Sequence, residues 1–288
     1  MKLINRNGEE SNVYPALLND WRNLVQLMPK LINPLMLNGT KFDQYKEYEQ
    51  YTTEESYKAV QELISLALRE QTNVHNFDIR MIKRLFIEYT AIDNSDTKDD
   101  YKSHTIIVDR NGNEHVAYSY LFTDYEEAIE LLDKIDTLVL LNNFEDESIR
   151  DHAIHMVYKA LNEKESKEDI IKYLDLDFFR EAFKVYYDLP MGYDHVLQND
   201  KRIEVGTVIK DEQGKEHRVF SMMLEHIDTA LKNLPVIHGE EPGDSYRATM
   251  ELLELAFNGQ YTGKQLEELL DVEIVGKVMG IYLGLPIV

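Results

Sequence analysis

Glu55-Ser-Tyr-Lys-Ala-Val-Gln-Glu-Leu-Ile-Ser-Leu-Ala-Leu68 returns near the far end of the chain as Asp244-Ser-Tyr-Arg-Ala-Thr-Met-Glu-Leu-Leu-Glu-Leu-Ala-Phe257. The paired residues are identical or similar in bulk or charge, except Val60/Thr249, Gln61/Met250 and Ser65/Glu254. A weaker middle copy extends from Glu147 to Asn162. Self-similarity of this kind is the signature of a repeat architecture. We therefore predict a mostly helical α+β protein made of three tandem modules, at residues 1–95, 102–190 and 203–288.

Each predicted module opens with a β-hairpin. Asn7-Gly8 and Asn111-Gly112 each lie between short runs that alternate between apolar and polar residues. Asn-Gly in this setting is the strongest short hairpin signal, because both residues tolerate the positive φ of a type I′ turn. The columns that align without gaps are Asn5/Asp109/Asp211, Gly8/Gly112/Gly214, Glu10/Glu114/Glu216 and Tyr14/Tyr118/Phe220. The aromatic residue after each turn is expected to anchor the hairpin on the next helix.

About three helices are predicted to follow each hairpin. Apolar residues at helical spacing predict a first helix at about 16–31, 124–141 and 222–234, the last of them ended by Pro235. The repeated stretch predicts a second helix at about 54–69, 146–162 and 244–258, with Ser56, Ser148 and Ser245 as N-caps. A closing helix is expected to start after Asp78, Asp175 and Asp271.

The chain is strongly acidic. It has 53 Asp and Glu residues against 31 Lys and Arg residues, which gives a formal net charge of −22 over 288 residues. Such a surface repels phosphate backbones and anionic lipid, so direct binding to nucleic acid or to a membrane is disfavoured. The same charge favours solubility and basic partners. A hydrophobic content of 43% indicates a folded chain and not a disordered acidic one.

The chain contains no cysteine, which excludes disulfides, thiolate zinc sites and cysteine nucleophiles. The first eight residues lack the apolar core of a signal peptide. The apolar segment 274–288 is interrupted by Lys277 and is too short to span a bilayer. We expect a soluble intracellular protein.

No motif predicts a catalytic residue, a cofactor site or a metal site. The chain has no phosphate-binding glycine loop, no Gly-x-Ser-x-Gly elbow and no His-Glu-x-x-His helix. His152 and His155 have metal-ligand spacing on a helix, but the other modules have no histidine there. His115 and His217 occupy equivalent strand positions, where we expect them to face solvent. We therefore predict that the protein is not an enzyme.

Several apolar side chains of the closing helices cannot all point toward one core. They are expected to pack on a neighbouring module or on a partner, because large apolar patches on an acidic surface mark partner sites. The candidate partner-binding residues are Phe178, Phe179, Phe183, Tyr187, Ile281, Leu283 and Leu285. The sequence leaves the oligomeric state open.

The predicted module resembles the small acidic tail assembly chaperones of long-tailed phages of Gram-positive hosts. The residues that carry the resemblance are the hairpin residues Asn7, Gly8, Glu9, Val13, Tyr14 and Pro15 and the helix residues Trp21, Leu24 and Val25. The resemblance covers one module at a time, and the threefold repetition departs from the single module of that family. It implies a non-enzymatic protein, cytoplasmic in the host cell, that coats the helical tape-measure protein during virion assembly.

The sequence therefore leads to two expected functions, which differ in the class of partner that the protein binds. The first is a chaperone that binds an extended apolar helix through several modules. The alternative is an acidic phage counter-defence inhibitor that occupies a basic site of a nucleic-acid-binding host protein. Binding by such an inhibitor would fall steeply with added salt, whereas the apolar contacts of a chaperone would persist.

Overall fold

The structure is a computed structural model that describes residues 2–31, 35, 51–69, 76–90, 104–135, 147–189, 202–211, 213–237 and 242–284. Within these residues it is an α+β fold with eleven α-helices and three small sheets. The chain groups into two compact units. The first comprises Met1–Thr105, Ala117–Leu131 and Lys184–Lys201, and the second comprises Ile106–Val116, Leu132–Phe183 and Arg202–Val288. Neither unit coincides with one predicted module, so the module boundaries stay a prediction.

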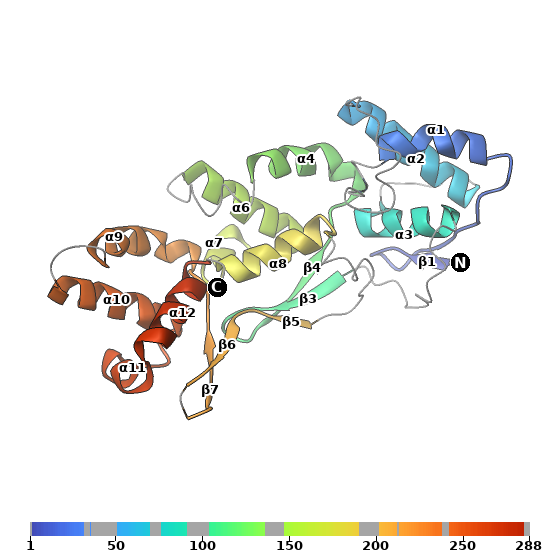
Figure 1. Ribbon diagram of the computed structural model, residues 1–288. Helices are drawn as coiled ribbons and strands as arrows, with labels where there is room; N and C mark the ends of the chain where they lie inside the picture. Colours follow the sequence, from blue (N-terminus) through green and yellow to red (C-terminus); the bar gives the residue numbers. More distant parts are fainter. Residues whose placement is uncertain are drawn as a thin grey trace. The chain divides into compact units, whose positions relative to one another are not determined.

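The N-terminal part of the first unit is a hairpin followed by three helices. The elements are β1 (Lys2–Ile4), β2 (Glu10–Asn12), α1 (Trp21–Leu31), α2 (Thr53–Leu68) and α3 (Ile79–Thr90) (Figure 1). The two strands are antiparallel, with Leu3 opposite Ser11. Helix α2 packs against both α1 and α3. Its inward face is fully buried at Val60, Leu63 and Ile64, which form the centre of this core.

The middle of the chain repeats the order of a hairpin and then helices. Its elements are β3 (His104–Val108), β4 (Glu114–Tyr118), the 3₁₀ turn η3 (Phe122–Asp124), α4 (Tyr125–Lys134), α6 (Glu147–Ala160), α7 (Lys167–Ile171) and α8 (Leu176–Tyr186). The C-terminal part contains β5 (Arg202–Glu204), β6 (Thr207–Lys210), β7 (Glu216–Val219), η4 (Leu224–His226), α9 (Ile227–Ile237), α10 (Pro242–Ala256), α11 (Gly263–Leu269) and α12 (Val272–Tyr282).

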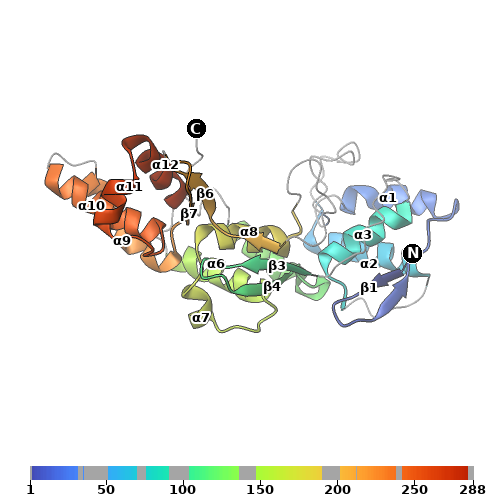
Figure 2. The ribbon, with the colours of Figure 1, turned by 90° about the horizontal axis from the view of Figure 1, so that it is seen from below.

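A third strand joins the β3–β4 hairpin. Strand β5 pairs parallel with β3, with Ile107 opposite Ile203, and gives the sheet order β4-β3-β5 (Figure 2). The N–H of Val205 donates to the carbonyl of Val108 at 3.1 Å and extends this pairing. The sequence did not predict β5, because a three-residue strand carries no periodic signal of its own.

The hairpin tips are three-residue loops, and the prediction of type I′ turns was wrong. The N–H of Gly8 donates to the carbonyl of Asn5, and the N–H of Asn5 donates to the carbonyl of Glu9, both at 3.0 Å. Gly8 has φ +83°, whereas Asn7 is not in the positive-φ region. A type I turn followed by a left-handed glycine forms this loop. The Asx side chains of Asn5, Asp109 and Asp211 accept two backbone N–H groups in each tip.

The first helices of the first and third predicted modules begin about five residues later than expected, whereas that of the second begins where it was predicted. Helices α1 and α9 begin at Trp21 and Ile227, and α4 begins at Tyr125. The prediction that Pro235 ends its helix was wrong, because α9 continues to Ile237. Proline near the C-terminal end removes one helical hydrogen bond, and tertiary packing can offset that cost. The segment expected to extend α4 beyond residue 135 lies outside the described residues.

The second helices lie where the repeated stretch predicts them, but their caps differ. Thr52 caps α2 through a capping box in which its hydroxyl accepts from the N–H of Glu55 at 3.2 Å and the Glu55 carboxylate accepts from the N–H of Thr52 at 2.9 Å. Ser56 lies inside the helix and is buried. Ser245 lies inside α10, and Ser148 lies inside α6. The prediction of serine N-caps was wrong, because each helix begins before its serine.

Two short helices were not predicted. Helix α7 follows the N-cap Ser166, whose hydroxyl accepts from the N–H of Asp169 at 3.1 Å. Helix α11 follows Thr262, which forms a capping box with Gln265. Each lies between the second helix and the closing helix. A hydroxyl residue three positions before an acidic or amide residue is a signal for the start of a helix, and both α7 and α11 carry it.

Gly206 is a position where the fold requires glycine. It has φ +93°, and a Cβ built there would lie 2.9 Å from the ring of Phe220 and 3.0 Å from the carbonyl oxygen of Val219. We predict that Gly206→Ala lowers the free energy of unfolding by about 1–3 kcal/mol, measured by denaturant titration. Gly276→Ala is the control, since an added Cβ meets nothing within 4 Å in α12 and should stabilise the helix by about 0.5–1 kcal/mol. Equal stabilities of the two variants would contradict this account.

Candidate functional site

A short antiparallel backbone bridge joins the start of α3 to the segment that follows β4. The N–H of Ile79 donates to the carbonyl of Tyr120 at 3.0 Å, and the N–H of Phe122 donates to the carbonyl of Phe77 at 2.8 Å. Between these bonds Asp78 pairs with Leu121. We call this contact junction 1. All of its residues lie in the first compact unit.

The same contact occurs at the start of α8. The N–H of Leu176 donates to the carbonyl of Met222 at 3.1 Å, and the N–H of Leu224 donates to the carbonyl of Leu174 at 3.0 Å. Asp175 pairs with Met223 between them. We call this contact junction 2, and all of its residues lie in the second compact unit. The residues of junctions 1 and 2 occupy the same columns of the aligned sequence.

The aspartate of each junction is the N-cap of its closing helix. Asp78 accepts from the N–H of Met81, and Asp175 accepts from the N–H of Phe178, both at 2.8 Å. This confirms the helix-start signal read at both positions. At the third position, Asp271 accepts from the N–H of Ile274 at 2.7 Å and starts α12.

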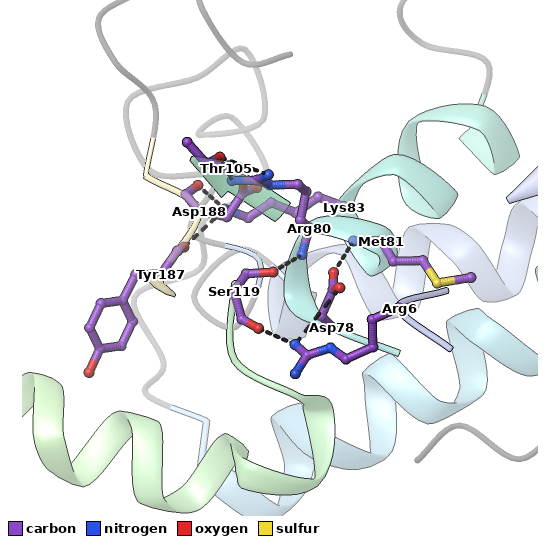
Figure 3. Close-up of polar contacts among 9 residues, drawn as sticks. All are labelled: Arg6, Asp78, Arg80, Met81, Lys83, Thr105, Ser119, Tyr187 and Asp188. Atoms are coloured by element: carbon purple, nitrogen blue, oxygen red, sulfur yellow. Dashed lines mark hydrogen bonds and ion pairs between the residues drawn. The ribbon is translucent and has the colours of Figure 1, made fainter. Parts of the chain in front are cut away.

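An arginine from the hairpin tip completes junction 1. The Arg6 guanidinium donates to the carbonyl of Ser119 at 2.5 Å and lies 3.9 Å from the Asp78 carboxylate (Figure 3). It also lies 5.0 Å from the centroid of the Tyr118 ring, which is a cation–π contact. The Ser119 hydroxyl accepts from the N–H of Arg80 at 3.4 Å.

Arg110 has the corresponding position in junction 2. Its guanidinium lies 5.0 Å from the centroid of the Phe220 ring and donates to the carbonyl of Leu255 at 3.2 Å. The Ser221 hydroxyl accepts from the N–H of Asp177 at 2.9 Å. Both arginines follow the Asx residue of a hairpin tip, so the aligned sequence brings the same side chains to both junctions.

Burial dominates the electrostatics of junction 2. Asp175 is fully buried, and one of its carboxylate oxygens has no hydrogen-bond partner among the described residues. Burial raises the pKa of Asp175 to about 7, although the N–H of Phe178 and the charge of Arg110 oppose the shift. Burial likewise lowers the pKa of Arg110, and the Asp175 charge opposes that shift. The carboxyl and the guanidinium are therefore buried with only part of their hydrogen-bonding capacity used by the described residues.

A second charge cluster in the first unit is well paired. Asp188 accepts from Arg80 Nε at 2.9 Å, and its carboxylate lies 3.3 Å from Lys83 Nζ (Figure 3). Lys83 Nζ also donates to the carbonyl of Asp188 at 2.5 Å. Arg80 reaches the Thr105 hydroxyl at 3.3 Å. Burial lowers the pKa of Lys83, and the Asp188 carboxylate opposes this shift. The cluster therefore ties α3 to the residues after α8.

The two equivalent histidines are buried, so the prediction that they face solvent was wrong. His115 Nε2 lies 3.2 Å from the Asp109 carboxylate, and its Nδ1 lies 2.8 Å from the Glu165 carboxylate. His217 Nε2 lies 2.9 Å from the Asp211 carboxylate, and its Nδ1 lies 2.8 Å from the hydroxyl of Tyr261. Each histidine thus ties the Asx residue of its hairpin tip to the segment between the second helix and the short helix that follows it.

Most of the predicted partner-binding residues lie inside the chain. Phe178, Phe179, Phe183 and Tyr187 are all buried, and so is Ile281. Phe178 packs edge-on against His115 and Tyr173, and the Tyr187 hydroxyl donates to the carbonyl of Ala128 at 2.8 Å. Leu283 is half-buried, and Leu285 lies outside the described residues. Burial supports internal packing, and a partner could reach the aromatic side chains only if the chain opened.

The described residues contain no group of three or more histidine, aspartate or glutamate side chains placed to hold a metal ion. His152 Nδ1 lies 2.5 Å from the carbonyl of Ser148, which is a contact within α6. Among the described helices, none is both long and apolar enough to cross a membrane. At the junctions, Arg6 and Arg110 each donate to a backbone carbonyl, and Asp78 and Asp175 each accept from a backbone N–H.

The comparisons with known proteins give no relative. No family model, no curated protein and no solved structure matches the chain.

The raised pKa of Asp175 makes junction 2 sensitive to pH. A carboxyl whose pKa is higher in the folded chain contributes stability below its unfolded pKa of about 4, and that stability is lost as pH rises through about 7. We predict that Asp175→Asn, which keeps the cap, matches the wild type only below about pH 4 and exceeds it increasingly as pH rises, by about 2–4 kcal/mol near pH 8. Denaturant titrations across this range measure the difference. The control is Asp271→Asn at the half-exposed cap of α12. The prediction would be contradicted if the difference in unfolding free energy between Asp175→Asn and the wild type did not grow with pH.

The Asp188 cluster gives a prediction of opposite sign. Asp188→Asn keeps the left-handed backbone at φ +49° but leaves Arg80 and Lys83 without their carboxylate. Breaking a buried pair by removing one partner is expected to cost about 2–4 kcal/mol of unfolding free energy. Glu54→Gln is the matched control, because the exposed Glu54–Lys58 pair should be worth less than about 0.5 kcal/mol. Similar losses in the two variants would show that Asp188 does not hold this cluster.

Proposed function

We propose that the chain is a non-enzymatic binding protein built from three tandem modules, each a hairpin and its following helices. Recurrent backbone bonds support this proposal. Two residues after the aromatic residue of each hairpin, a backbone N–H donates to the carbonyl of a tyrosine in the last turn of a closing helix. The pairs are Ala16–Tyr89, Tyr120–Tyr186 and Met222–Tyr282. The aromatic residue itself donates to the end of the second helix in the pairs Tyr14–Ala67 and Phe220–Ala256.

The partner that we propose is an apolar helix, and the open faces of the hairpins carry this proposal. Each hairpin buries one face on helices and leaves an apolar side chain on the other. These side chains are Ile4, Val116 and Val208, with 48%, 37% and 47% of their surface exposed. Glu10, Glu114 and Glu216 share those faces, each in an ion pair with a basic residue, namely Lys2, Arg202 and Lys210. An amphipathic helix with an apolar stripe and charged flanks would match this pattern.

Tandem modules would strengthen such binding. One exposed valine or isoleucine gives a weak contact, but linked contacts act at a high effective concentration on one long client. A tape-measure protein is a long apolar helix, so this supports the function implied by the resemblance to phage tail assembly chaperones. In this proposal the protein shields that client in the cytoplasm of the host cell during virion assembly.

The net charge of −22 favours the alternative of a counter-defence inhibitor that fills a basic channel. The two functions differ in their response to salt. Charge-based binding falls steeply as the Debye length shrinks to about 4 Å near 0.5 M salt, whereas apolar contact does not weaken.

The test is co-expression with the tape-measure protein of a long-tailed phage of a Gram-positive host. We predict that the wild type keeps the client soluble and still binds it in about 0.5 M salt. The triple variant Ile4→Asp, Val116→Asp and Val208→Asp should weaken binding at least tenfold, because charge replaces apolar contact on every hairpin. Val236→Asp, at a similarly exposed position of α9, is the control. Unchanged binding by a folded triple variant would remove the hairpin faces from the proposal, and binding lost in salt would favour the inhibitor.

A further inference from the structure

The chain displays one unpaired copy of each half of the junction, and we propose that these two halves join separate copies of the protein head to tail. The head face is the segment Ala16–Trp21 in the first unit. The tail face is Leu270–Val272 at the start of α12, together with Tyr246 of α10, in the second unit. The occupant of each face is therefore the other face on a second copy of this chain.

The head face has the sequence columns and the backbone shape of the segment that enters junctions 1 and 2. Leu18 aligns with Phe122 and Leu224, which are 0% and 5% exposed inside the junctions, whereas Leu18 is 91% exposed. The turn is already formed, since the N–H of Asp20 donates to the carbonyl of Leu17 at 2.9 Å. The corresponding bonds Asp124–Leu121 and His226–Met223 measure 2.8 and 3.0 Å.

The backbone groups that make the bridge are unused at the head face. In junctions 1 and 2 the carbonyls of Tyr120 and Met222 each accept a hydrogen bond from the start of a closing helix. The head-face counterpart is the carbonyl of Ala16, which would accept the same bond from a second copy. The N–H of Leu18 corresponds to the donors Phe122 and Leu224. Neither the Ala16 carbonyl nor the Leu18 N–H has a hydrogen-bond partner among the described residues.

The tail face is prepared in the complementary way. Asp271 caps α12 as Asp175 caps α8, and Leu270 and Asp271 are extended, with φ −110° and −83°. Val272 is 89% exposed, whereas its counterparts Ile79 and Leu176 are 0% and 3% exposed inside the junctions. The Leu270 carbonyl and the Val272 N–H, which would make the bridge, have no partner in the described part of the chain.

Side chains on the two faces are complementary as well. In junction 1 the ring of Tyr57 stacks on Phe122 at 4.4 Å with an interplanar angle of 5°. Tyr246 has the position of Tyr57 in the repeated stretch and is 52% exposed, so it offers the same platform for Leu18. Trp21 is 47% exposed, while its counterparts Tyr125 and Ile227 are 4% and 1% exposed. Together these contacts would bury much of the exposed apolar surface at both ends.

The arginine of the junction is already supplied at the head face. Arg69 lies 4.8 Å from the centroid of the Tyr14 ring and donates to the carbonyl of Pro15 at 3.3 Å. Arg6 makes the same two contacts with Tyr118 and Ser119 in junction 1. In the tail module the aligned sequence has Glu212 in place of this arginine. A contact between copies would therefore bring one arginine and not two to the aromatic ring.

Head-to-tail contacts are heterologous, so they produce a ring or an open chain of copies. The net charge of −22 on each copy opposes such assembly, and salt screens that repulsion. Assembly should accordingly increase with both protein concentration and salt. This dependence is opposite to that of a contact between a basic partner and an acidic surface.

The test uses the purified full chain with no client, so its result is independent of the proposed chaperone function. Sedimentation velocity should show the wild type growing from the 33.7 kDa monomer into larger species at up to about 1 mM protein in about 0.5 M sodium chloride. Leu18→Asp and Val272→Asp should each weaken self-association at least tenfold. Both sites are almost fully exposed, so the variants keep the fold. Val236→Asp, at an exposed position of α9 outside both faces, is the control and should assemble as the wild type does.

An equimolar mixture of the two variants gives the decisive measurement. Leu18→Asp keeps an intact tail face and Val272→Asp keeps an intact head face, so the mixture should form a one-to-one dimer that grows no further. A wild type that stays monomeric under all these conditions would overturn the proposal. So would assembly of either variant alone at the wild-type level, or a mixture that forms no dimer.

Discussion

The first turn of a helix leaves N–H groups that the helix itself cannot satisfy, and burying that end requires partners for them. At the start of α3 and of α8 an aspartate takes one N–H, and a carbonyl from the segment after the next hairpin takes another. The same segment returns an N–H to the carbonyl just before the aspartate. Each closing helix can therefore be buried at its start only if the following hairpin is in place.

This dependence explains why the compact units cut across the sequence repeat. Tyr120 and Phe122 belong to the middle of the chain by sequence, but their backbone bonds are with the start of α3, and they group with the first unit. The Asp188 carboxylate does the same through Arg80 and Lys83. A proposed module is thus a unit of sequence, whereas the unit of packing includes the edge that the next module contributes.

Much of the helical fold could be predicted because the repeated stretches of sequence indicate where helices lie and which helices correspond to one another. The aspartate starts were readable, since a cap is set by neighbouring residues. The turn type, the serine caps and helices α7 and α11 were misjudged from local signals, whereas other failures depended on contacts distant in sequence. His115 was expected in solvent because its partner, the Glu165 carboxylate, lies 50 residues away in sequence. Strand β5 was missed because it pairs with β3, which is distant in sequence. Pro235 stays helical because packing, and not propensity, decides where α9 ends.

The aromatic residues predicted to bind a partner are buried, and Phe178 packs on His115 and Tyr173 of its own predicted module. The segment after the next hairpin covers the apolar residue that starts a closing helix, as the burial of Ile79 and Leu176 shows. Where no described segment of the chain covers such a residue, as at the head face and the tail face, the apolar surface stays exposed. Leu18 and Val272 are at those two places and are the most exposed of the large apolar side chains in the described residues. Repeat proteins ordinarily give their end modules a polar outer face. Here Arg69 covers one aromatic ring but leaves the bridge-forming backbone open, so each end keeps the means to bind what the interior already binds.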